Sequence, residues 1–93
     1  MSTAAPYRST PVFTNQTLPA ALRRAHSTKE GVWALLKVFQ GSILFTVEES
    51  GESQVVRAPG AVTIVPLQLH SVEPLEQMEM QVDFYDQAPD SVT

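Results

Sequence analysis

His26 and His70 are the only histidines in this chain of 93 residues, and they are its best candidates for chemistry. An imidazole can bind a transition metal or exchange a proton near neutral pH, so the pair suggests a metal site or an acid–base site. Each histidine stands at the edge of a segment with strand-like composition. If the fold brings the two together, they supply half of the ligand shell that a divalent metal such as zinc requires.

The other ligands would have to be carboxylates, because the sequence contains no cysteine. Glu73 follows His70 by three positions, so a regular strand would direct these two side chains to opposite faces. Asp83 alternates with Val82 and Phe84, and it points outward if those apolar residues line the interior. The pattern alone leaves open which face is the interior. The predicted metal-site residues are therefore His26, His70, Asp83 and Glu73, with zinc, iron, nickel or manganese as the ion.

Simpler interpretations of the same residues remain open. His26 could cap a loop, and His70 could satisfy backbone groups near a barrel mouth without any ligand role. Lys29 could bind an anion beside His26, although a surface lysine is the simpler interpretation. Trp33 could stack on a ligand, but a core or interface anchor is favoured. The sequence contains no glycine-flanked nucleophile turn and no glycine-rich phosphate loop, so we assign no catalytic residue.

Short strands separated by turns make up most of the chain, which predicts an all-β domain. Gly41, Gly51 and the pair Pro59-Gly60 mark turns between the strands. One short helical turn is expected after Pro19. The predicted strands are 11–14, 32–40, 42–48, 54–58, 61–65, 70–73 and 78–85. This organisation predicts a flexible arm over residues 1–10, one β-barrel domain over 11–85 and a polar tail over 86–93.

The composition describes a small acidic protein. Its net charge is −4 and Arg23-Arg24 is the one adjacent basic pair, which argues against a nucleic-acid surface. The N-terminus lacks the features of a signal peptide, and no apolar run approaches the roughly 20 residues that span a bilayer. We therefore expect a cytoplasmic protein that binds neither nucleic acid nor membrane. A chain this short buries little more than roughly 60% of its unfolded surface, so we also expect a homodimer, with residues 11–14 as the contact edge.

One stretch resembles a known motif. In GAVTIVPLQLH, residues 60–70, a glycine turn, a strand, a proline and a histidine follow one another as in the second cupin motif. The whole chain resembles the small cupin family associated with tellurite-resistance proteins, the TehB/YeaR-like domain. The resemblance runs through RSTPVF (8–13), LPAAL (18–22), HSTKEGVW (26–33), VFQG (38–41), PLQLHSVE (66–73) and VDFY (82–85). It implies a single-domain, cupin-type double-stranded β-helix, or jelly roll, with His70 directed into the barrel.

The first cupin motif is incomplete in this chain. Cupins carry a His-x-His pair and then a glutamate seven positions before a glycine. His26 matches the first histidine, but Thr28 stands at the second, and Ala34 stands at the glutamate position counted back from Gly41. Two of the four usual ligands are missing, which weakens any transfer of cupin oxygenase or isomerase chemistry.

Three functional hypotheses follow. The leading one is a small intracellular cupin module that binds a divalent metal, a small molecule or both, and the resemblance links it to a response to tellurite or other oxyanions. The alternative is a metal-dependent enzyme of the oxygenase or isomerase type that uses an open metal position. The third is an interaction domain in which the face around Trp33 and Phe39 is buried in a dimer.

Overall fold

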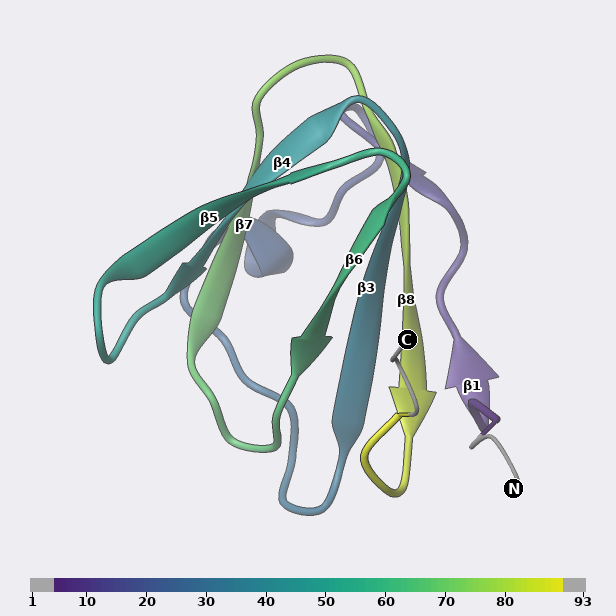
Figure 1. Ribbon diagram of the computed structural model, residues 1–93, viewed down its shortest axis with the longest axis vertical. Coiled ribbons are helices and arrows are strands. Elements are labelled where there is room, and N and C mark those ends of the chain that lie inside the picture. Colours follow the sequence, from purple (N-terminus) through teal and green to yellow (C-terminus); the bar gives the residue numbers. More distant parts are fainter. Residues whose placement is uncertain (1–4, 90–93) are drawn as a thin grey trace.

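Two antiparallel sheets pack against each other in the computed structural model, which describes residues 5–89 (Figure 1). One sheet has the strand order β1-β8-β3-β6, with β2 also paired to β8, and the other has the order β5-β4-β7. The strands are β1 (Arg8–Ser9), β2 (Phe13–Thr14), β3 (Trp33–Gln40), β4 (Ser42–Val47), β5 (Glu52–Arg57), β6 (Gly60–Ile64), β7 (His70–Pro74) and β8 (Glu79–Tyr85). The predicted all-β class is confirmed.

The chain passes from one sheet to the other between β3 and β4, and again between β5 and β6, β6 and β7, and β7 and β8. The first of these crossings depends on a glycine. Gly41 has a φ of 74°, and a Cβ atom at this position would collide with the carbonyl oxygen of Gln77. A side chain here would therefore strain the backbone and displace the segment before β8.

Alternating side chains from both sheets form the core. Leu36 and Val38 of β3 meet Ile43 and Phe45 of β4 across the interior. The predicted apolar face of the last strand is confirmed: Met78, Met80 and Val82 are buried, and Phe84 packs against the core. Because side chains alternate along a strand, Asp83 lies on the opposite, outer face of the same sheet.

The N-terminal segment is more ordered than the sequence suggests. Arg8 and Ser9, which fall in the predicted arm, form β1 and pair with Phe84 and Asp83 of β8. In place of the predicted strand 11–14 the structure has the shorter β2 (Phe13–Thr14), which also pairs with β8. A two-residue strand takes its stability from its partner, so its own residues carry little signal. Residues 1–4 of the predicted arm and 90–93 of the predicted tail lie outside the described residues.

The helical turn expected after Pro19 is present as a 3-10 helix, η1 (Ala20–Arg23). The amide of Leu22 donates to the carbonyl oxygen of Pro19 over 3.0 Å, and the Leu22 side chain packs against the core. The chain then leads directly to His26. Within residues 5–89, no helix is long and apolar enough to cross a membrane.

Candidate functional site

His26 and His70 lie side by side, as the metal-site hypothesis requires. The amide of His26 donates to the carbonyl oxygen of His70 over 3.0 Å, and the amide of His70 donates back to His26 over 2.8 Å. The centroids of the two imidazole rings are 4.1 Å apart. His70 begins β7 and is only 2% exposed, whereas His26 is half-buried. An isolated backbone bridge between His26, which follows η1, and His70, the first residue of β7, thus positions both rings.

The backbone holds both rings at Nδ1. The Nδ1 atom of His26 lies 2.9 Å from the carbonyl oxygen of Arg24, and that of His70 lies 2.8 Å from the carbonyl oxygen of Gln68. A carbonyl oxygen can only accept a hydrogen bond, so each Nδ1 carries the hydrogen. In the neutral ring the lone pair is then on Nε2, at the tip of the imidazole. Nε2 is therefore the atom that each histidine can offer to a metal or to a ligand donor.

A tight turn places the carbonyl group that orients His70. The amide of Gln68 donates to the carbonyl oxygen of Val65 over 3.3 Å, with Pro66 and Leu67 between them. Proline is favoured at the second position of such a turn. Leu67 occupies the third position with a φ of 66°, a left-handed conformation that usually takes glycine. Leu67 immediately precedes Gln68, whose carbonyl oxygen accepts the hydrogen bond from Nδ1 of His70.

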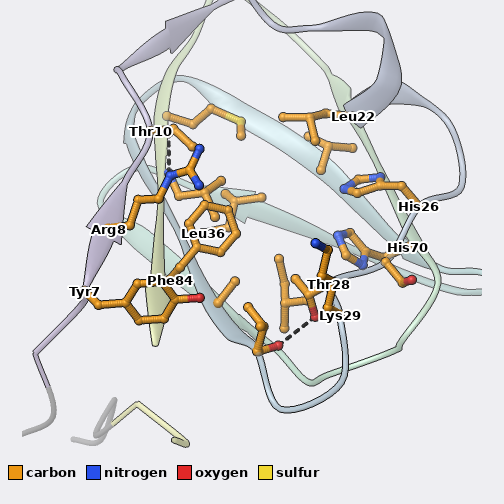
Figure 2. Close-up of a pocket in the computed structure, with 17 residues that line it drawn as sticks. Tyr7, Arg8, Thr10, Leu22, His26, Thr28, Lys29, Leu36, His70 and Phe84 are labelled. Atoms are coloured by element: carbon orange, nitrogen blue, oxygen red, sulfur yellow. Dashed lines mark hydrogen bonds between the residues drawn. The ribbon is translucent and has the colours of Figure 1, made fainter. Parts of the chain in front are cut away.

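A cavity of about 370 Å³ lies between the two sheets, and the histidines form part of its wall. Most of its surface comes from apolar side chains on the inner faces of the strands, including Leu36, Ile64, Val72, Val82 and Phe84. Figure 2 shows His26 and His70 on one side of this cavity, with the ammonium of Lys29 beside them. Tyr7 and Arg8 lie on the other side, beyond Leu36 and Phe84 in this view.

The charge of the cavity differs from that of the molecule. The net charge of the chain is −4, yet no aspartate or glutamate is among the described residues that line the cavity. Arg8 and Lys29 both line it. Neither forms an ion pair within residues 5–89, where the ion pair observed joins Lys37 to Asp83 outside the cavity. The described lining of the cavity thus carries positive charge in an acidic protein, from two side chains that are both exposed to solvent.

Burial lowers the pKa of His70 below its ordinary value of 6.5. The carbonyl of Gln68 acts in the opposite direction, because it accepts a hydrogen bond from the charged ring. The neighbouring His26 lowers the pKa of His70 further, whereas Glu48 raises it. Because burial is the largest of these effects, His70 is a neutral imidazole at pH 7.

The fold and this geometry can be compared with known proteins. A profile of the TehB-like domain matches residues 8–82. The chain belongs to the TehB-like domain family. Crystal structures of two proteins resemble this TehB-like domain. TehB from Haemophilus influenzae has a TM-score of 0.79 and 26% identity over 95% of this chain, and a protein from E. coli (strain K12) has a TM-score of 0.82 and 23% identity.

The two structures differ in how much of their length the TehB-like domain covers. It spans 95% of the E. coli protein but only 32% of the Haemophilus influenzae TehB chain. The match to TehB therefore concerns one part of a larger protein. No curated protein sequence matches the chain at a significant level.

The two carboxylates predicted as metal ligands lie apart from the histidines in this TehB-like domain. Asp83 is 4% exposed on the outer face of its sheet, where Oδ2 lies 2.7 Å from Nζ of Lys37 and Oδ1 accepts a hydrogen bond from Ser9 Oγ over 2.7 Å. Glu73 is exposed on β7. Neither residue lines the cavity. Metal binding at His26 and His70 stays a prediction, with these two as the protein ligands brought together.

Sequence reasoning missed the cavity residues of the N-terminal segment. Tyr7, Arg8 and Thr10 line the cavity, although the local pattern placed them in a flexible arm. The resemblance to the family begins at Arg8, and that was the one available signal for this segment. Lys29 was considered as an anion ligand, and the structure places it in the cavity wall.

Proposed function

We propose that this TehB-like domain binds a small molecule with an apolar body and an anionic group. The observation that carries the proposal is the lining of the cavity between the sheets. Apolar side chains form its walls, Arg8, Lys29 and the two histidines supply polar groups, and no carboxylate is among the described lining residues. Its volume of about 370 Å³ lies within the usual size range of small-molecule pockets.

The anionic group of the ligand would bind next to Lys29 and the histidine pair. The ammonium of Lys29 offers a charge-assisted hydrogen bond. The neutral ring of His70 offers an acceptor at Nε2, suited to a hydroxyl or protonated acid on the ligand. The apolar body would lie against side chains such as Val72 and Phe84, where burial contributes roughly 25 cal/mol per Å² of apolar surface.

The proposal also includes a cupin-type jelly-roll fold and a role in the response to oxyanions. The repeated passage of the chain between two sheets, together with the position of His70 after Gly60 and Pro66, supports a cupin-type jelly roll. Membership of the TehB-like family supports a link to tellurite or other oxyanions. A compact oxyanion would bind at the cationic part of the cavity wall and leave the apolar walls unfilled.

A divalent metal is the second candidate occupant. It is favoured by one observation: both Nδ1 atoms donate to backbone carbonyls, so both Nε2 lone pairs remain available. His26 and His70 would hold the ion, and water or ligand atoms would complete the shell. A bound metal would act as a Lewis acid. The positive charge of Lys29 and Arg8, which line the same cavity, opposes a dication and places this candidate second.

A metal-dependent oxygenase or isomerase would need more than this pair. Catalytic metals are commonly held by three protein ligands, with the remaining positions open to substrate. Among the described residues, no group of three His, Cys, Asp or Glu side chains could hold an ion. A binding function therefore requires fewer additional assumptions than an enzymatic one.

The proposal is tested by titrating isotope-labelled, metal-free protein with heptanoate and with heptylamine, which share a chain but differ in charge. We expect heptanoate to shift the NMR amide signals of Leu36 and Val72 in the cavity wall, and heptylamine to leave them unchanged. Lys29→Gln should weaken heptanoate binding several-fold. Arg57→Gln is the matched control, because Arg57 is exposed on β5 and does not line the cavity. Equal responses to both probes, or none to either, would contradict the proposal, and tellurite added alone tests the oxyanion link.

We also propose that the domain forms a homodimer through the outer face of the β3 sheet. Alternation places Trp33, Leu35 and Phe39 of β3 on this face, and Phe39 is 48% exposed. The charged residues at its centre, Lys37 and Asp83, neutralise each other. The exposed Glu79 also lies on this face by alternation with the buried Met80, so the proposed contact is centred on the neutral pair and on the aromatic residues, which are enriched in interfaces.

Light scattering during size-exclusion chromatography tests this interface. Phe39→Glu should convert the dimer to a monomer, because it places a charge in the proposed contact. Val55→Glu is the matched control, since Val55 is similarly exposed, at 46%, on the other sheet. A monomeric wild-type protein would rule out the homodimer. A dimer that survives Phe39→Glu would instead favour the contact at the edge formed by residues 11–14.

A further inference from the structure

Two cationic side chains line the cavity from opposite sides, with an apolar wall between them (Figure 2). We propose that the ligand is a linear molecule with an anionic group at each end of an apolar chain, as in an aliphatic dicarboxylate. Arg8 would bind one end, and Lys29 with the histidine pair would bind the other. This inference rests on the proposed binding function and adds the chemical class of the ligand.

The register of β1 directs Arg8 toward the cavity. Ser9 pairs with Asp83, and its hydroxyl donates to Asp83 on the outer face of the sheet. Successive side chains in a strand point to opposite faces, so Arg8 lies on the inner face. Its partner in the register is Phe84, which also lines the cavity. The pairing that places Ser9 on the outer face therefore places Arg8 on the cavity side, where it lines the cavity and remains exposed to solvent.

Several hydrogen bonds fix this segment to β8. The amides of Tyr7 and Thr10 donate to the carbonyl oxygens of Phe84 and Val82, each over 2.9 Å. The side-chain amide of Gln81 donates to the carbonyl oxygen of Thr10 over 2.8 Å. The backbone that carries Arg8 is thus held in place before any ligand binds, which reduces the entropy lost on binding.

The two ends of the cavity each carry a cationic side chain, whereas its middle is apolar. Arg8 and Lys29 have no ion-pair partner among residues 5–89, and the lining that the structure describes contains no carboxylate. Between them lie apolar side chains such as Leu36 and Val82. A ligand with one charged end would leave the second cation without a counter-charge. A ligand with two charged ends of suitable separation would pair both and still bury its chain.

Calorimetric titration at pH 7 with heptanoate, heptanedioate and the shorter and longer dicarboxylates tests the inference. We expect heptanedioate to bind about tenfold more tightly than heptanoate, because a charge-assisted hydrogen bond is gained at the Arg8 end. The affinity should pass through a maximum along the series, since the separation of Arg8 and Lys29 is set by the fold. Arg8→Gln should lower the affinity for heptanedioate to that for heptanoate, so that the preference is lost, whereas Arg57→Gln, which lies outside the cavity, should leave the preference intact.

The outcomes separate this inference from the function on which it rests. Equal affinity for heptanoate and heptanedioate, or a preference that survives Arg8→Gln, would overturn the two-ended ligand while the anion-binding cavity stands. A loss of heptanoate binding in Arg8→Gln would also overturn it, because Arg8 would then bind the single anionic group. Absence of binding by every probe would overturn both. Circular dichroism and thermal unfolding confirm that each variant is folded.

Discussion

The ring of Phe45 stacks on the imidazole of His70, with centroids 5.4 Å apart and an angle of 28° between the planes. Phe45 belongs to the core, so this contact ties the candidate site to the packing between the two sheets. It also covers His70 with an apolar surface. A change of charge on His70 therefore affects the stability of the whole domain, not only the cavity.

We predict that metal-free protein loses stability as the pH falls below about 6.5. The pKa of His70 is lowered by burial in the folded state, and the unfolded chain titrates at the ordinary value of 6.5. Between these two pKa values the unfolded state binds more protons, so the free energy of unfolding falls as the pH falls through this window. Above it the contribution of neutral His70 is fully present. Urea unfolding measured from pH 8 to pH 5 checks this.

His70→Gln is the control for the pH prediction, because glutamine keeps a hydrogen-bond donor without a titrating ring. We expect a smaller dependence of stability on pH in this variant across the same window. His26 and Glu48 are the titratable groups whose charges act on His70, so His26→Gln and Glu48→Gln should shift the window without removing it. Identical pH profiles for the wild-type protein and His70→Gln would show that another group is responsible.

The proposed metal site depends on both histidines. We predict that His26→Ala and His70→Ala each remove stoichiometric uptake of zinc, nickel, iron or manganese, as measured by elemental analysis after dialysis. A single imidazole binds a divalent ion too weakly to retain it. Because His70 is buried, His70→Gln is tested in parallel as a variant that disturbs the core less. A double mutant that keeps the metal would place the ion elsewhere.

Filling the cavity should abolish ligand binding without unfolding the domain. Ala34 is fully buried on β3 and lines the cavity, so Ala34→Leu would extend methyl groups into its space. We expect a change in the free energy of unfolding of less than about 1.5 kcal/mol, because the added volume enters a cavity and not a packed core. The heptanoate titration should show at least a tenfold loss of affinity. Ala61→Leu, on the outer face of the neighbouring strand, should leave binding unchanged.

The strands could be predicted from the sequence because their signals are local. The predicted segment 32–40 contains β3 (Trp33–Gln40), and the glycine and proline turns separate the strands as expected. The apolar face of β8 also followed from alternation. The pairing of His26 with His70 joins segments far apart in the sequence, so no local pattern could show it. Only the family resemblance suggested it.

The cavity could not be predicted for the same reason. Arg8 faces it because β1 pairs with β8 in one particular register, and two residues carry no periodic signal. In contrast, the sequence alone identified the two histidines as candidate site residues, because the chemistry of an imidazole does not depend on the fold. Asp83 combines both cases: alternation indicated that it could face outward, but its partners Lys37 and Ser9 become apparent only when three strands are assembled.

Those contacts make Asp83 an anchor for the segment that carries Arg8. We predict that Asp83→Asn lowers the free energy of unfolding by about 1–3 kcal/mol, since the carboxylate is buried and accepts bonds from two partners, although the partial exposure of Lys37 reduces the effect. Ser9→Ala should cost about 1 kcal/mol. Both variants should accelerate hydrogen exchange at the amides of Tyr7 and Thr10, which bond β8. Ser53→Ala, which removes a hydroxyl on the other sheet, is the control, and unchanged exchange in Asp83→Asn would show that β1 is held without this anchor.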